Sequence, residues 1–143
     1  MKLICVTANR HIFDGQTNGK PVRLRLTFEG NVALRLQVAG DGERMLVDDG
    51  PIDEPFDMDE YGGMDIADVT RSLFPTLVGR EIVDADSLAR NERCVGLRLN
   101  QTDGEPFYFW VDGDELGWGD EAALARHSWA HAPAPIVSGH ITL

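Results

Sequence analysis

Two neighbouring stretches of the chain alternate between apolar and polar residues. Residues 22–28 and residues 32–38 both carry an apolar side chain at every even position. Successive side chains of a β-strand point to opposite faces, so this period of two predicts two half-buried strands. The Glu-Gly-Asn segment at 29–31 favours a turn between them. The chain must therefore contain an antiparallel hairpin with one buried face. Its outer face carries Arg23, Arg25 and Arg35.

The second half of the chain repeats the order of segments found in the first half. The matching pairs are 3–8 with 81–85, 22–26 with 95–99, 32–38 with 107–111, and 44–47 with 116–118. All antiparallel meanders share alternation and glycine turns, so internal duplication and chance similarity stay open as alternatives. Either way, residues 1–47 and 80–143 are predicted to form two similar four-stranded meanders.

The segment between the two halves, residues 48–79, is predicted to be an acidic loop followed by a helix. Prolines and a Gly-Gly pair exclude a regular element in its first part. From Asp65 to Pro75, apolar residues recur at spacings of three and four, and Asp65 can cap a helix. Two further elements are predicted, a helix from Asp120 to about His131 and an edge strand within residues 136–143. The predicted fold class is α+β, predominantly antiparallel β with one or two short helices.

Size and apolar patterning place the protein in a broad class. A chain of 143 residues is long enough to bury one core as a single domain. Apolar runs such as residues 107–111 are far shorter than the roughly 18 residues that span a bilayer. The apolar stretch within residues 1–8 is too short for a signal-peptide core. Cys5 and Cys94 lie in apolar, strand-like segments, which favours reduced core thiols. We therefore expect a cytoplasmic protein that has no membrane partner.

The negative charge of the chain is unevenly distributed. The net charge is −11, and residues 48–68 contain nine acidic and no basic residues. Nucleic-acid binding requires clustered Lys and Arg to neutralise phosphates, so a nucleic-acid partner is not expected. An acidic segment of this kind favours a basic protein or a cation.

Within the acidic segment, residues 57–68 have the spacing of a calcium-binding loop. Counting from Asp57, aspartates stand at positions 1, 3, 9 and 12 and a glycine at position 6. Such spacing lets carboxylates converge on one ion while the glycine allows a sharp turn. The segment resembles an EF-hand-type loop and is similar to the calcium loop of dockerin modules, although Tyr61 replaces an oxygen ligand at position 5. If calcium binds, its ligands are Asp57, Asp59, Asp65 and Asp68; otherwise the segment is a solvated loop and no cofactor is expected.

Other chemistry-bearing residues give weaker signals. His127 and His131 lie four residues apart on the second predicted helix and could face one metal. No phosphate-binding loop, dinucleotide motif or nucleophile elbow occurs, and no serine has the flanking residues of a nucleophile. A hydrolase-like enzyme that uses scattered carboxylates with His127 or His131 is therefore only the third hypothesis, and no catalytic residue is assigned.

An aromatic segment, residues 107–110, is apolar on both faces of its predicted strand. The matching strand of the first half has Arg35 and Gln37 on its outer face, so Tyr108 and Trp110 need a cover. Either a helix or the C-terminal strand packs there, or the two rings form an exposed patch that binds a ligand or partner.

The preferred functional hypothesis is a non-enzymatic, acidic protein-interaction module of the inhibitor or immunity type that masks a basic partner. The alternative is a β-domain that binds calcium or a small ligand. The residues expected to contact a partner are Asp53, Glu54, Asp57, Asp59, Glu60, Tyr108 and Trp110.

Overall fold

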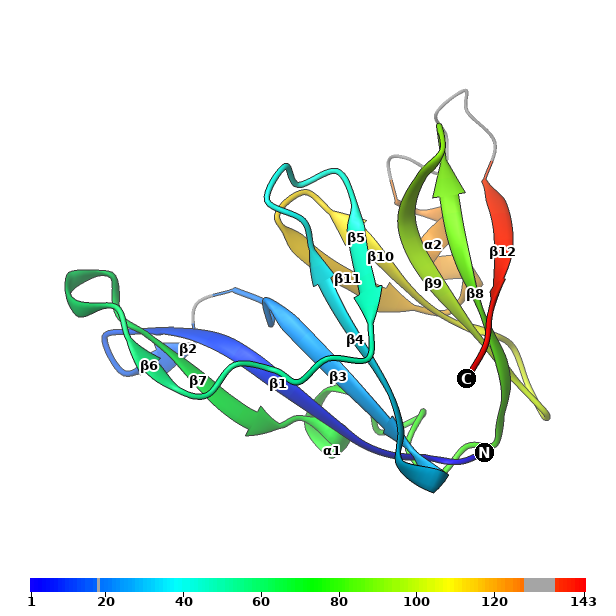
Figure 1. The fold of residues 1–143 in the computed structure, drawn as a ribbon, viewed down its shortest axis with the longest axis horizontal. Helices are drawn as coiled ribbons and strands as arrows, with labels where there is room; N and C mark the ends of the chain where they lie inside the picture. Colours follow the sequence, from blue (N-terminus) through cyan, green and yellow to red (C-terminus); the bar gives the residue numbers. More distant parts are fainter. Residues whose placement is uncertain (18, 128–135) are drawn as a thin grey trace.

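The computed structural model describes residues 1–17, 19–127 and 136–143. Over these residues the chain forms two antiparallel sheets joined by a short connection (Figure 1). The first sheet contains β1 (Leu3–Phe13), β2 (Gln16–Thr17), β3 (Arg23–Phe28), β4 (Val32–Val38), β5 (Met45–Asp48), β6 (Phe56–Asp57) and β7 (Gly63–Asp68). The second contains β8 (Ile82–Arg90), β9 (Arg93–Gln101), β10 (Phe107–Asp112), β11 (Glu115–Gly119) and β12 (Val137–Ile141).

The predicted hairpin is present as β3 and β4. Leu24 pairs with Leu36 and Leu26 with Leu34, and all four side chains are buried. The one-turn helix η1 (Glu29–Asn31) connects the strands, and Gly30 adopts a φ of 79°, a region that glycine enters without steric cost. The alternating pattern therefore corresponds to a strand pair with one buried face, as predicted.

The strand orders of the two sheets are closely similar. The first sheet runs β5-β4-β3-β1-β7-β6, with β2 paired to β1, and the second runs β11-β10-β9-β8-β12. In each sheet a meander of four strands is extended by a later strand, which pairs with the first strand of that meander. β12 provides this extension in the second sheet, which agrees with the edge strand predicted near the end of the chain.

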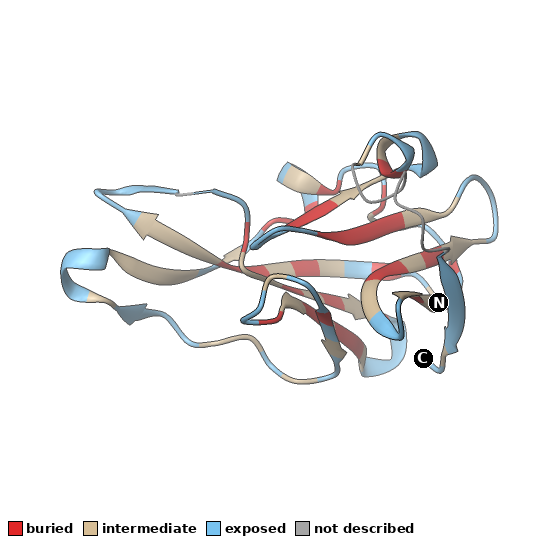
Figure 2. Cartoon of the chain, turned by 90° about the horizontal axis from the view of Figure 1, so that it is seen from above, coloured by how far each residue is buried: buried red, intermediate tan, exposed pale blue. Residues whose placement is uncertain are grey.

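The core lies between the two sheets, where the buried faces of their central strands meet (Figure 2). Phe74, from the connection between the sheets, occupies the centre of an aromatic cluster. Its ring centroid lies 5.7 Å from that of Phe109, 6.1 Å from that of Phe107 and 5.1 Å from that of Trp118. The connection thus contributes directly to the core that holds the sheets together.

The helix predicted between residues 65 and 75 is much shorter in the structure. Residues 63–68 form β7, because β1 extends to Phe13 and offers them a long edge with which to pair. Only α1 (Thr70–Leu73) is helical. Asp68, rather than Asp65, precedes this turn and accepts a hydrogen bond from the Thr70 amide at 2.9 Å.

The second predicted helix is present as α2 (Glu121–Ala125). Asp120 caps it as expected, because its carboxylate accepts a hydrogen bond from the Ala123 amide at 2.8 Å. The helix ends earlier than predicted, because Arg126 and His127 follow it as a turn, and the predicted positions 128–131 lie outside the described residues. No helix within the described part of the chain is long and apolar enough to cross a membrane.

Candidate functional site

The acidic segment begins with residues 48–53, here called the strap, which cross the outer face of the first sheet. The strap is fixed at Asn9, whose side chain is fully buried. The Asn9 side chain donates to the Asp53 carbonyl at 2.8 Å and accepts from the Asp53 amide at 2.8 Å. A second donor contact from Asn9, at 3.2 Å, reaches the Asp65 carbonyl of β7. One buried amide thereby ties the strap to both β1 and β7.

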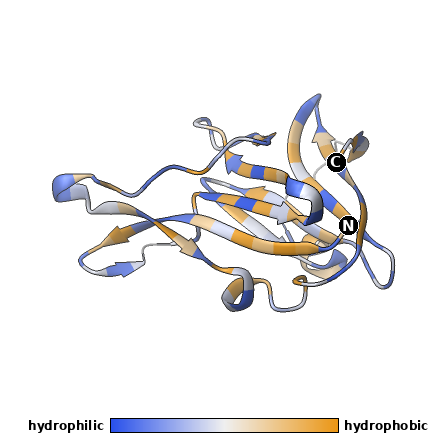
Figure 3. Cartoon of the chain, turned by 60° about the horizontal axis from the view of Figure 1, so that its bottom comes forward, coloured by the Kyte–Doolittle hydropathy of each residue, from blue (hydrophilic) through white to orange (hydrophobic). Residues whose placement is uncertain are grey.

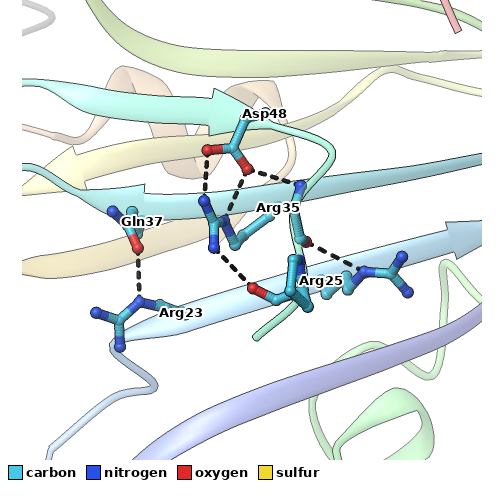
Figure 4. Close-up of polar contacts among 7 residues, drawn as sticks. Arg23, Arg25, Arg35, Gln37 and Asp48 are labelled. Atoms are coloured by element: carbon cyan, nitrogen blue, oxygen red, sulfur yellow. Dashed lines mark hydrogen bonds and ion pairs between the residues drawn. The ribbon is translucent and has the colours of Figure 1, made fainter. Parts of the chain in front are cut away.

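The three arginines of the outer face bind the strap along its length, and Figure 4 shows the contacts of Arg25 and Arg35 with it. Arg35 makes two parallel hydrogen bonds to Asp48, at 2.7 and 2.6 Å, and donates to the Pro51 carbonyl at 2.7 Å. Arg25 donates to the Gly50 carbonyl at 3.3 Å. The remaining contacts join Arg23 to Asp53 at 3.0 Å and Arg23 to Gln37 at 2.6 Å.

These contacts neutralise part of the acidic segment within the molecule. Hydrogen bonding to Arg35 lowers the pKa of Asp48 and raises the pKa of Arg35, so both groups are held in their charged forms. Asp53, predicted to contact a partner, is paired with Arg23 in this structure, and its role toward a partner stays a prediction. The strap is consequently a structural element, and the carboxylates of the acidic segment that lack such pairing lie further along the chain.

Residues 11–17 and 54–66 form a second part of the site, here called the arm. It comprises the end of β1, β2, β6, the one-turn helix η2 (Asp59–Tyr61) and most of β7, and it projects away from the body of the molecule (Figure 1). Five of its carboxylates have no Lys, Arg or His nitrogen within 4 Å in the described part of the chain. These are Asp14, Glu54, Asp57, Asp59 and Glu60.

Large apolar side chains are exposed on the same arm. Tyr61 is 67% exposed at the tip, and Phe13, Phe56 and Ile66 are 52%, 46% and 43% exposed. Figure 3 shows hydrophilic residues at the tip next to hydrophobic stretches of the neighbouring strands. Exposed aromatic side chains beside uncompensated charge are typical of a protein-interaction surface.

The tip of the arm is held in one conformation by its own contacts. The Met58 amide donates to the Gly62 carbonyl at 2.8 Å, and the Asp59 amide donates to the Asp57 carboxylate at 2.9 Å. Gly62 has a φ of 92°, and a Cβ at this position would lie 2.1 Å from the Ile12 carbonyl oxygen. Because only glycine fits there, the turn that carries the acids is packed closely against β1.

The four aspartates of the predicted calcium loop do not converge. Asp65 forms a salt bridge with Arg10 at 2.8 Å, and Asp68 is bonded to Thr70. Residues 63–68 form a strand, in which residues three apart point to opposite faces. No group of three or more His, Cys, Asp or Glu side chains in residues 1–17, 19–127 and 136–143 is arranged to hold a metal ion. Calcium binding remains a prediction from the sequence, which a titration can test.

Tyr108 and Trp110 are covered rather than exposed. They are 7% and 6% exposed and pack with Leu88 and with Leu124 of α2. The cross-strand neighbours of Trp110 are both glycines, Gly96 and Gly117, which leaves room for the indole ring on the surface of the sheet. Of the two alternatives for this face, the structure shows the packed helix, because Leu124 of α2 covers the rings; a partner contact by Tyr108 and Trp110 stays a prediction.

The histidine pair of the second predicted helix is only partly described. The Nε2 atom of His127 lies 3.0 Å from a carboxylate oxygen of Asp112, and its ring lies 6.1 Å from that of Trp110. His131 lies outside the described residues. His127 is thus positioned by a carboxylate and an aromatic ring at the end of α2.

No protein-family model, curated protein or solved structure matches this chain. The site is therefore interpreted from its own geometry. Sequence reasoning identified the acidic segment but missed the role of Asn9 and the exposed apolar residues Phe13 and Phe56. Residues 1–47 carry more basic than acidic residues, and this excess could have indicated that part of the acidic segment pairs with arginines of the same chain.

Proposed function

We propose that the protein is a non-enzymatic interaction module whose arm binds a basic protein, in the manner of an inhibitor or immunity protein. The observation that carries this proposal is the group of arm carboxylates that have no Lys, Arg or His nitrogen within 4 Å among the described residues, together with the exposed rings of Phe13, Phe56 and Tyr61. Such a surface attracts a cationic partner electrostatically and buries apolar area on contact. The strap supports the proposal because it ties β1 and β7 together at the base of the arm.

The partner can be sought with a photo-reactive amino acid at position 61, and position 83 serves as the control. Tyr61 is 67% exposed at the tip of the arm, whereas Val83 is 59% exposed in the second sheet. A basic protein should be captured from position 61 and not from position 83. Capture from position 83 alone would place the interface elsewhere and contradict the proposal.

Association kinetics with the captured protein then test the electrostatic argument. The variant Asp57→Asn, Asp59→Asn, Glu60→Gln removes three charges from the arm, and a control variant with Asp103→Asn, Glu105→Gln, Asp114→Asn removes three charges elsewhere. At low salt the arm variant should associate about tenfold more slowly, since steering raises association rates by orders of magnitude. The difference should shrink to about twofold or less near 1 M salt, where the Debye length is about 3 Å. Equal effects of the two variants would argue against the arm.

We also propose that the two halves of the chain arose by duplication and that the protein is cytoplasmic. The duplication is supported by the matching strand orders and by the equivalent, fully buried pairs Leu24 with Leu97 and Leu26 with Leu99. Superposing the two meanders tests it, because unrelated halves would not bring these leucines into register. Cell fractionation tests the location.

A further inference from the structure

The two faces of the arm differ in chemistry, and the strand register shows which residues lie on each. Directly paired residues of neighbouring strands lie on the same face of a sheet. Asn9, which holds the strap on the outer face, pairs with Ile66 of β7. Side chains alternate along a strand, so Phe13 of β1 and Met64 of β7 lie on the same face as this pair. Met64 pairs in turn with Phe56 of β6. The outer face of the arm therefore carries an apolar patch, defined here as Phe13, Phe56, Met64 and Ile66.

The inner face of the arm offers no comparable surface. Arg10 and Asp65 pair directly across β1 and β7, and their side chains form a salt bridge at 2.8 Å. Gly63 and Ala67 occupy the neighbouring inner-face positions of β7, and Ile12 is half-buried opposite Gly63. The inner face thus combines a satisfied ion pair with small side chains, and the exposed apolar area of the arm lies on its outer face.

Carboxylates border the apolar patch. The arm contains no Lys or Arg, although the rest of the chain holds 13 of them. Asp14 directly follows Phe13 in the chain, and Glu54 and Asp57 stand on either side of Phe56. In protein interfaces an apolar centre excludes water, while charges on the rim select a partner of opposite sign. The outer face of the arm therefore suits an apolar surface that is flanked by basic residues.

The edge of the arm is protected against the addition of a partner strand. β6 is the last strand of this sheet in the described part of the chain, and it contains only two residues. Pro55 directly precedes it and has no backbone N–H to donate. Very short edge strands and prolines both discourage pairing with another chain. These features favour a partner that lies on the face of the arm rather than along its edge.

An α-helix suits this face better than an extended segment does. A helix satisfies its backbone N–H and C=O groups internally, whereas an extended segment lying on an apolar face leaves them without partners. The arm is four strands wide, in the order β2-β1-β7-β6. Strands about 4.8 Å apart give it a width of about 14 Å, most of which a helix about 10 Å across would cover. Lys and Arg beside the apolar side of such a helix have stems long enough to reach the bordering carboxylates.

We infer that the outer face of the arm binds an amphipathic, basic α-helix of the partner. The apolar side of this helix packs on Phe13, Phe56 and Ile66, and its basic side chains pair with Asp14, Glu54 and Asp57. This inference rests on the proposed function, and it adds the face that is used and the kind of segment that is bound.

Short synthetic peptides serve as probes. The first is a fluorescently labelled Leu/Lys peptide whose leucines are spaced to lie on one side of a helix. The second has the same composition but alternates Leu and Lys, which favours a strand, and the third is the first with Glu in place of Lys. At low salt the first peptide should bind at least about tenfold more tightly than the second by fluorescence anisotropy, and the third should not bind. Circular dichroism should show the first peptide gaining helix on binding.

Paired substitutions of exposed apolar residues locate the binding face. Phe13→Ser with Phe56→Ser should weaken binding of the first peptide about tenfold or more, because apolar anchors at the centre of an interface dominate its affinity. Val83→Ser with Val137→Ser is the matched control. These two valines are 59% and 61% exposed and lie in the second sheet, so this variant should bind like the wild type.

Methyl NMR of the unmodified protein gives a measurement that does not depend on how the variants fold. The first peptide should shift the methyl signals of Met64 and Ile66 and leave those of Ile12 and Ala67 unchanged. Shifts confined to Ile12 and Ala67 would overturn the assigned face.

The peptides also separate this inference from the proposed function. Equal or tighter binding of the alternating peptide would refute the helix and leave a basic partner in place. Equal binding of the Glu peptide would remove the electrostatic basis of both. If neither Lys peptide binds, the inference fails, and capture of a basic protein from position 61 then decides separately whether the proposed function stands.

Discussion

Replacing Asn9 with alanine should destabilise the protein because this one side chain ties the strap to two strands. Asn9 is fully buried and makes two hydrogen bonds with the backbone of Asp53 and one with that of Asp65. Each such bond contributes a net of about 0.5–1.5 kcal/mol, and losing all three should cost about 1.5–4.5 kcal/mol of unfolding free energy. The loss of unfolding free energy is larger if the backbone groups of Asp53 and Asp65 that lose their hydrogen-bond partner remain buried.

Urea denaturation measures this cost as a lower midpoint with an unchanged m-value. Gln101→Ala is the matched control, because its amide also donates to a backbone carbonyl, that of Glu105, but in an exposed position. Water can replace that bond, so the control should lose about 0.5 kcal/mol or less. Amide exchange should show the Asp53 N–H protected in the wild type and unprotected in Asn9→Ala. If Asn9→Ala costs no more than Gln101→Ala, the anchoring role assigned to Asn9 is refuted.

Two further substitutions test other parts of the structure. Gly117→Ala places a Cβ 2.2 Å from Nε1 of Trp110 and should cost about 1–3 kcal/mol through overpacking, whereas Gly40→Ala, which meets no atom within 4 Å, should be nearly neutral by thermal melting. Asp48→Asn removes the solvent-accessible pair with Arg35 and should cost about 0.2–1 kcal/mol near neutral pH. Arg35 lowers the folded-state pKa of Asp48, so this stabilisation is present above the ordinary pKa of 3.8 and is lost as the pH falls through the lowered value. The denaturation midpoints of the two proteins should therefore converge as the pH falls from 3.8 through the lowered pKa of Asp48; a difference that persists below that lowered pKa would contradict this origin.

The β-strands of the hairpin could be predicted because the alternating pattern that indicates them lies within a few consecutive residues. Alternation in residues 22–28 is a property of seven consecutive positions, and the structure pairs them with β4 in the expected hairpin. The cap at Asp120 was predictable for the same reason, since its hydrogen bond reaches only to Ala123.

The strand β7 was not predictable from its own residues, because its conformation is decided by a distant partner. The spacing of Ile66, Val69 and Leu73 suits a helix, but a strand over residues 63–68 gains six cross-strand pairs with β1. Non-local pairing of this kind outweighs a short helical pattern. The predicted calcium loop was affected in the same way. The spacing of its aspartates predicts a metal site only if the residues around them form a loop, and residues 63–68 form a strand instead.

The sequence predicted the negative charge of the arm, but it did not predict that apolar side chains are exposed there. Phe13 and Phe56 are separated by more than 40 positions in the sequence, and the β1–β7–β6 ladder brings them onto one projection. The strap was missed because its attachment depends on Asn9, one of several polar residues in β1, and nothing local marks it as the anchor. Neither arrangement leaves a periodic trace in the sequence.

The free edge of β12 has a consequence for how the protein behaves at high concentration. Among the described residues β12 pairs only with β8, Val137 is 61% exposed, and the five residues of the strand include no Lys, Glu or Pro to discourage pairing with another copy. The net charge of −11 opposes such contacts by mutual repulsion between molecules. As the pH approaches the sequence pI of about 4.6, that repulsion vanishes and edge-to-edge association becomes favourable. The acidic composition of the chain therefore also gives the protein its colloidal stability.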